Sequence, residues 1–188
     1  MIIRPGGVFG RGFYVGGSTV GKVMRDLALS MIKGDPVTID LTTYGPNEYV
    51  YGKDVGHALC LSCKAENLKQ RTYNAGTGVV TGPEELAQAV RELAPKIEVK
   101  VGGARTADQS RNIPMDISVS RAELGYAPKF PLKEALQDYM DELLGRSSPI
   151  VEIPAAYHHI PLDQPLALVA ALRAILADWE HSVPRRPA

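Results

Sequence analysis

The stretch "MIIRPGGVFGRG" (residues 1–12) joins a short apolar strand signal to a turn rich in glycine. Pro5 ends the strand early, and glycines then stand at positions 7, 10 and 12. Glycines between a strand and a helix allow backbone N–H groups to approach a pyrophosphate at the helix N-terminus. The next helix signal begins only near Val20, which is late for such a loop. Two interpretations stay open: a dinucleotide-binding loop, the less favoured, and a strand from the middle of a larger unit.

Strand and helix signals alternate from this stretch as far as residue 144. The strand signals cover residues 36–41, 48–52, 71–76 and 96–102, and the helix signals cover 20–32, 55–66, 81–93 and 131–144. The best-marked helix start has Thr81, Pro83 at a first helical position, and Glu84 three residues after the threonine. Such alternation predicts an α/β fold.

Composition limits the classes of partner. The 188 residues carry 21 Lys and Arg against 21 Asp and Glu, so no net field attracts nucleic acid or anionic lipid. No apolar run approaches the roughly 20 residues of a membrane-spanning helix. The 2 cysteines make no disulfide framework, which predicts a cytoplasmic protein.

Two motifs bear on catalysis. Tyr49 and Lys53 have the Tyr-x-x-x-Lys spacing, in which a lysine lowers the pKa of a phenol on the same helix face. The intervening "VYG" is typical of a strand, which disfavours that role. His57, Cys60 and Cys63 recur at helical spacing, but no second Cys/His pair has the spacing to supply the fourth ligand that a metal needs. We therefore expect buried structural cysteines and no metal.

The order of segments resembles that of a known family. "IIRPGGVFG", "GDPVTI", "EYVYGKDVGHAL", "TYNAGTG" and "MDISVSRAELGYAPKFPLKEAL" follow one another as in the C-terminal half of the extended short-chain dehydrogenase/reductases, the NAD-dependent epimerase/dehydratase family. The resemblance covers residues 1–144. It implies a partial Rossmann-like sheet plus the small substrate-binding subdomain. It also implies that the nucleotide-binding units and the catalytic Tyr-x-x-x-Lys helix would lie upstream of Met1.

The resemblance also implies roles for particular residues. Those expected to contact NAD or NADP are Pro5, Gly6, Gly7 and Val8. Those expected to contact a small-molecule, sugar-like substrate are Phe9, Asn47, Tyr49, Arg105 and Arg111. Nucleotide-sugar members of the family carry an arginine before the "YVY"-like segment, where this chain has Asn47 and Glu48. The departure argues against a nucleotide sugar.

The C-terminal residues resemble a different family. "VEIPAAYHHIPLDQPLALVAALRAILADW" (151–179) is similar to the last strand, histidine loop and last helix of an α/β-hydrolase. The predicted organisation is a domain over 1–145, a linker over 146–149, a strand–helix appendage over 150–180 and a tail over 181–188. His158 would be catalytic only with a Gly-x-Ser-x-Gly nucleophile, which the sequence lacks.

Three functional hypotheses follow. The first is the substrate-binding portion of an NAD(P)-dependent epimerase/dehydratase or a sugar or alcohol oxidoreductase, inactive alone. The second is a non-catalytic ligand-binding or accessory module. The third, disfavoured, is an α/β-hydrolase. We expect cofactor binding by this chain alone to be weak or absent, and the appendage to pack loosely or to mediate a homodimer.

Overall fold

The computed structural model describes residues 1–11, 19–103 and 113–145, with Leu166 and Ala170. Residues 1–146 form one compact unit. The predicted linker, the hydrolase-like segment with His158, and the tail lie outside the described residues apart from those two positions. Their boundaries and roles remain predictions.

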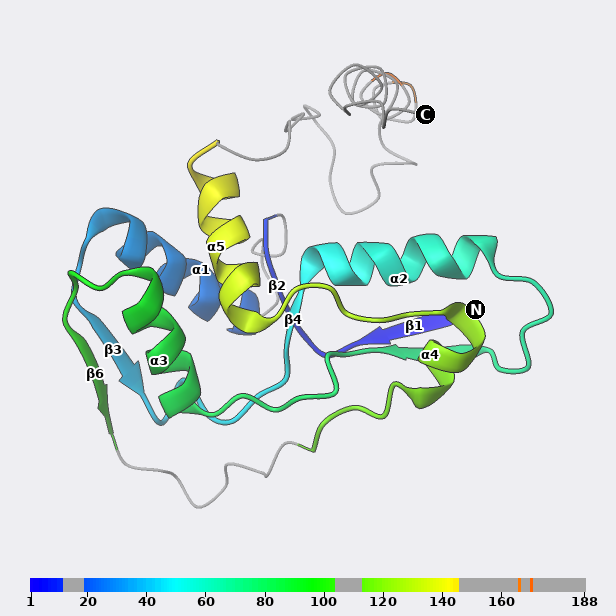
Figure 1. Cartoon of the computed structure of the whole chain (residues 1–188), viewed down its shortest axis with the longest axis horizontal. Helices are drawn as coiled ribbons and strands as arrows, with labels where there is room; N and C mark the ends of the chain where they lie inside the picture. The colour runs from blue at the N-terminus through cyan, green and yellow to red at the C-terminus, as the bar shows by residue number, and fades with distance from the viewer. Residues whose placement is uncertain (12–18, 104–112, 146–165, 167–169, 171–188) are drawn as a thin grey trace, which may run out of the picture. The chain divides into compact units, whose positions relative to one another are not determined.

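The described chain is an α/β fold, as the alternating signals predict (Figure 1). The strands are β1 (Ile2–Pro5), β2 (Gly7–Phe9), β3 (Val37–Asp40), β4 (Tyr49–Tyr51), β5 (Thr72–Ala75) and β6 (Val99–Gly102). The helices are α1 (Thr19–Lys33), α2 (Gly52–Lys64), α3 (Pro83–Leu93), α4 (Ser118–Leu124) and α5 (Leu132–Leu143). Every element except β2 and α4 lies within a few residues of its sequence signal. β2 falls in the glycine-rich stretch and α4 in the segment "SVSRAEL", and neither was predicted as a strand or a helix.

The strands pair in parallel, β1 with β5, β2 with β4 and β3 with β6. β1 and β2 follow one another in the chain but have different partners, so the chain crosses from one pair to the next at Gly6. β3 and β4 flank the Gly45-Pro46 turn but do not pair with each other. Parallel pairing requires crossover connections, which the helices supply.

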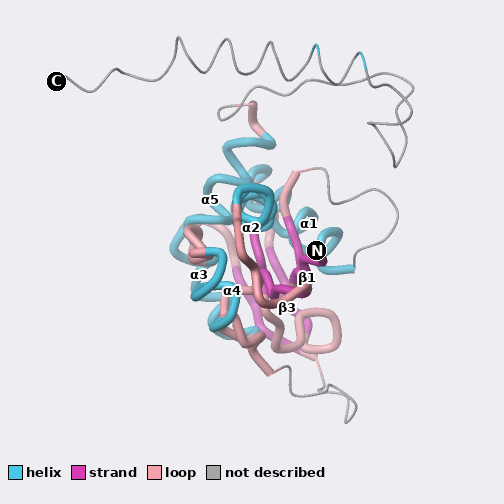
Figure 2. Tube along the Cα trace, turned by 90° about the vertical axis from the view of Figure 1, so that its right-hand side faces the viewer, coloured by secondary structure: helices cyan, strands magenta, loops and turns pink. Residues whose placement is uncertain are grey.

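Three hydrophobic clusters lie in the described body. The largest joins α1, α3 and α5 to the β2–β4 and β3–β6 pairs, and the rings of Phe9, Tyr51 and Tyr139 meet inside it. The second lies around β5 and includes Tyr73 and Tyr126. The third consists of three valines, Val8, Val50 and Val55. Figure 2 shows the strands inside the body with helices around them. Burying each such large side chain contributes about 1.5–3 kcal/mol.

Helix α2 corrects one prediction. It begins at Gly52, three residues before its signal, and Asp54 in its first turn is fully buried. Cys60 and Cys63 are exposed free thiols, so the expectation of buried cysteines was wrong. The physical reason is the orientation of the helix, whose buried face consists of Asp54, Val55, Ala58 and Ser62. The described residues contain no group of three possible metal ligands, and none of their helices is long and apolar enough to span a membrane.

The buried tyrosines should set the alkaline limit of stability. Burial raises the pKa of Tyr49 to about 12, and burial is also the first cause of a raised pKa in Tyr44, Tyr51, Tyr73, Tyr126 and Tyr139. A pKa raised by folding contributes stability that is complete below the unfolded value, about 10, and is lost as pH rises through the folded value. We therefore expect tyrosinate absorbance at 295 nm to rise together with loss of circular dichroism, above about pH 10. Ionisation of all 8 tyrosines of the chain near pH 10 with the fold retained would contradict this burial.

Candidate ligand-binding site

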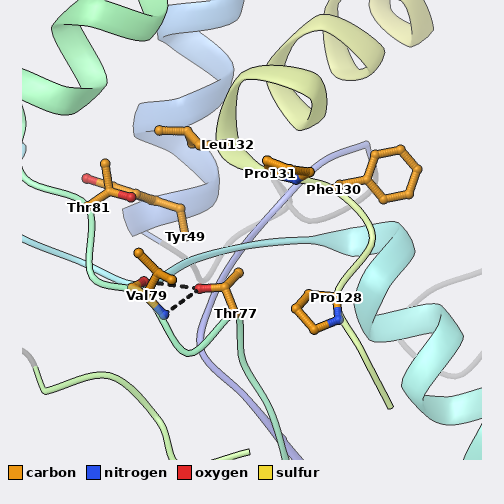
Figure 3. A pocket seen from close by; sticks show the side chains of 8 residues that line it. All are labelled: Tyr49, Thr77, Val79, Thr81, Pro128, Phe130, Pro131 and Leu132. Carbon is orange, nitrogen blue, oxygen red and sulfur yellow. Dashed lines mark hydrogen bonds between the residues drawn. The ribbon is translucent and has the colours of Figure 1, made fainter. Parts of the chain in front are cut away.

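A cavity of about 310 Å³ opens between three segments of the body (Figure 3). Tyr49 comes from β4, residues 77–81 from the loop between β5 and α3, and residues 128–132 from the segment that leads into α5. The lining residues are Tyr49, Thr77, Val79, Thr81, Pro128, Phe130, Pro131 and Leu132. Small-molecule sites commonly begin at about 300 Å³ and are mostly apolar. The cavity has the size and the lining of such a site.

A buried carboxylate fixes the loop wall of this cavity. Glu48 is 4% exposed, and its Oε1 accepts hydrogen bonds from the backbone N–H groups of Thr77 at 2.6 Å and Gly78 at 2.9 Å. Its Oε2 accepts from the N–H of Met115 at 2.6 Å. Gly76 leaves room for this carboxylate, because a Cβ at position 76 would lie 2.1 Å from Oε1. Glu48 therefore ties the loop and the segment before α4 to the start of β4.

A second buried carboxylate fixes the opposite wall. Asp54 Oδ1 accepts a hydrogen bond from the N–H of Lys129 at 2.7 Å, and Oδ2 accepts from that of Phe130 at 3.3 Å. These bonds fix the segment before α5 against the first turn of α2. Both cavity walls are thus loop segments attached by backbone N–H groups to an acid of the β4–α2 region. Sequence reasoning missed this role of Glu48 and of Asp54.

A charged cluster lies next to the Asp54 contact. Lys53 Nζ is 2.6 Å from Asp138 Oδ2 and 3.1 Å from Glu142 Oε1. The hydroxyl of Tyr51 lies 2.6 Å from Asp138 Oδ2 and 3.0 Å from Glu142 Oε2. Burial alone would lower the pKa of Lys53, but the hydrogen bonds and negative charges of both acids raise it. Burial and the same acids raise the pKa of Tyr51.

This geometry bears on the Tyr-x-x-x-Lys motif. Tyr49 lies in β4 and Lys53 in α2, so the pair does not share a helix face. The ammonium of Lys53 lies 5.8 Å from the centre of the Tyr51 ring and is paired with two carboxylates. A phenol that accepts a proton needs a lowered pKa, whereas burial raises the pKa of Tyr49. The geometry offers no activated tyrosine at this motif.

The predicted cofactor residues line the β1–β2 junction. A Cβ at Gly6 would lie 3.0 Å from Val50 Cγ2, and one at Gly7 would lie 3.0 Å from the carbonyl oxygen of Glu48. The N–H of Gly7 donates to that same oxygen at 3.0 Å. These glycines let β2 approach β4, and the room beside them is filled by the chain itself. Contact of Pro5 to Val8 with NAD or NADP stays a prediction.

The predicted substrate residues separate into three groups. Tyr49 lines the cavity, and Asn47 exchanges backbone hydrogen bonds with Thr81, which also lines it. Phe9 is fully buried between the rings of Tyr51 and Tyr139, which makes it a core residue rather than part of the cavity lining. Arg105, Arg111 and His158 lie outside the described residues.

Comparisons with known proteins place the fold. A scan against models of known protein families found no match, and a search of curated proteins found none either. Among solved structures, the chain is similar to ADP-L-glycero-D-manno-heptose-6-epimerase from Helicobacter pylori, with a TM-score of 0.60 and 20% identity over 76% of this chain and 43% of that one. It is similar to a GalE-like L-threonine dehydrogenase from Cupriavidus necator, with a TM-score of 0.60 and 24% identity over 75% and 47%.

A third solved structure is UDP-glucose 4-epimerase from Thermus thermophilus, with a TM-score of 0.57 and 28% identity over 77% of this chain and 46% of that one. The chain therefore spans less than half the length of each of these proteins. Its fold is the Rossmann-type α/β fold of short-chain epimerases and dehydrogenases, present in part.

Proposed function

We propose that this chain is the substrate-binding portion of an NAD(P)-dependent epimerase- or dehydrogenase-type oxidoreductase, and that the substrate occupies the cavity beside Tyr49. The observation that carries the proposal is the cavity itself, whose two walls are each fixed by a buried acid. Similar proteins were solved with UDP-glucose (the Thermotoga maritima 4-epimerase) and with NAD (the Thermus thermophilus 4-epimerase).

The open edge of β1 supports a partial sheet. β1 pairs with β5, and among residues 1–11, 19–103 and 113–145 no strand pairs with its other edge. Ile2 on this strand is 58% exposed. An unpaired apolar edge is where a sheet is extended by a further strand. This fits a body that supplies one part of a larger sheet.

NAD(P) would supply the hydride acceptor in the complete reaction. The side-chain positions of Gly6 and Gly7 face Val50 and Glu48 of the same chain. A dinucleotide site here would therefore need further residues beyond the described ones. The chain's own contribution is to hold the substrate and exclude water from it. We further propose a cytoplasmic protein with a small-molecule ligand and a homodimeric assembly.

The 188-residue chain is expected not to oxidise alcohols or epimerise sugars by itself. The reason is that Tyr49 and Tyr51 have raised pKa values and the ammonium of Lys53 is paired with Asp138 and Glu142, so neither tyrosine is prepared to accept a proton. The measurement is absorbance at 340 nm with NAD or NADP and an alcohol panel, with UDP-glucose epimerisation followed separately. Sustained turnover that Tyr49→Phe abolishes would overturn the proposal and restore the Tyr49–Lys53 motif as catalytic.

The alternative is a non-catalytic ligand-binding module. It is favoured because the Tyr49–Lys53 motif holds no activated tyrosine. The two differ in coupling between sites. In an oxidoreductase portion, saturating NAD should change the affinity of the cavity ligand, because substrate and nicotinamide lie in contact. In a binding module it should leave that affinity unchanged.

A further inference from the structure

The lining of the cavity excludes charge. None of its eight residues is ionised at neutral pH, and three of the side chains carry hydroxyl groups (Figure 3). Val79 and Thr77 of the loop stand on one side, and Pro128 and Pro131 on the other. With Phe130 and Leu132, these two prolines give the cavity a largely apolar wall, which is suited to a compact apolar group.

Near the cavity, three kinds of group that commonly bind anions already pair with acids of this chain: loop N–H groups, an N–H at a helix start and a lysine. The glycine-rich loop after β5 has N–H groups that would suit a phosphate, but those of Thr77 and Gly78 donate to Glu48. The start of α3 follows Thr81, and there the N–H of Gly82 donates to Glu85 Oε2 at 2.6 Å. Lys53, next to the Phe130 wall, is paired with Asp138 and Glu142. The N–H groups and the ammonium group that could bind an anion near the cavity therefore already pair with carboxylates.

The hydroxyl of Tyr49 is a weakly paired donor of the lining. Within the part of the chain that the structure describes, its acceptor is the carbonyl oxygen of Gly45 at 3.5 Å, which is beyond the range of a good hydrogen bond. Burial raises the pKa of Tyr49 to about 12, so the hydroxyl keeps its proton across the physiological range. Thr77, in contrast, accepts from the N–H of Val79 and donates to its carbonyl. Tyr49 is therefore suited to donate to an acceptor oxygen on a ligand.

We propose that the cavity binds an uncharged, compact ligand with an apolar ring and a carbonyl or hydroxyl oxygen that accepts from Tyr49. The inference names the ligand class of the proposed substrate site and so rests on that function. It disfavours nucleotide sugars and small carboxylates, because the eight described lining residues carry no cation and the N–H groups of Thr77 and Gly78 already donate to Glu48.

The test is an amide chemical-shift titration of the full chain with four probes: acetophenone, its isosteric anion benzoate, UDP-glucose and NAD. Acetophenone is expected to shift the amides of Thr77, Val79, Thr81 and Leu132 with a dissociation constant of about 1 mM. Benzoate should bind at least roughly tenfold more weakly, because its charge must be desolvated without a partner. Tyr49→Phe should weaken acetophenone about fivefold by removing one hydrogen bond.

Two variants control for folding. Tyr73→Phe removes a hydroxyl that donates to Glu123, in the hydrophobic cluster around β5. It should leave acetophenone binding unchanged. Val79→Trp adds bulk at a rim position that is 62% exposed and should abolish binding with the fold intact.

The outcomes separate the two proposals. Tighter binding of benzoate or UDP-glucose at the same amides would overturn the neutral ligand class and keep the cavity as the substrate site. If no probe shifts these amides, both the ligand class and the proposed function of the cavity are wrong.

Discussion

Glu48→Gln is expected to lower the free energy of unfolding by about 2–3 kcal/mol, because buried N–H groups lose charged acceptors. Glu48 accepts from the three N–H groups of Thr77, Gly78 and Met115. A glutamine can offer one oxygen, and its NH₂ group would then face an N–H on the other side. Urea unfolding followed by circular dichroism measures the change. Glu66→Gln, at an exposed position, should change stability by less than about 0.5 kcal/mol.

Gly76→Ala tests the same contact from the other side. The new Cβ would lie 2.1 Å from Glu48 Oε1, so the carboxylate must move away from its donors. We expect a loss of about 1–3 kcal/mol, the usual cost of overpacking. Gly56→Ala is the matched control, because nothing lies within 4 Å of its added Cβ inside α2. That control should gain about 0.5–1 kcal/mol from helix propensity. Equal effects of the two alanines would contradict the buried Glu48 contact.

Asp54→Asn is expected to destabilise the chain by about 1–3 kcal/mol and to loosen the α5 wall of the cavity. Asp54 is fully buried, and its two oxygens accept from the N–H groups of Lys129 and Phe130. An asparagine keeps one acceptor and turns a donor toward the second N–H. The two readouts are urea unfolding and hydrogen exchange of the Lys129 and Phe130 amides, which should become faster than those of α3.

The exposed Asp35→Asn is its matched control and should be neutral. Unchanged amide protection in Asp54→Asn would show that the segment before α5 is held by packing alone.

The order of helices and strands was predictable because the spacing of apolar residues and the choice of turn residues depend only on residues close in sequence. The strand at 48–52 and the helix at 81–93 each appear close to their signals. The role of Glu48 was not predictable, because one acidic residue before an apolar run looks the same whether it is solvated or buried. Its donors lie 29 and 67 residues away in sequence, at Thr77 and Met115.

The same limit explains the error at the two cysteines. Helical spacing placed Cys60 and Cys63 on one face but could not show which face turns inward, and α2 buries the face with Asp54 instead. Phe9 packs against the rings of Tyr51 and Tyr139, and Tyr49 lines the cavity. Substrate contact by Phe9 and Tyr49 stays a prediction.

The most direct test of the account is a titration of one isotope-labelled sample, first with NAD and then with acetophenone. We expect NAD at about 1 mM to leave the amides of Gly6 to Gly10 unshifted, because most dinucleotide contacts in this fold come from its first βαβ half. Acetophenone should then shift the amides of Thr77, Val79 and Thr81. Saturable micromolar binding of NAD at Gly6 to Gly10, with the cavity amides unmoved by acetophenone, would contradict a substrate-binding portion and show a self-contained cofactor site instead.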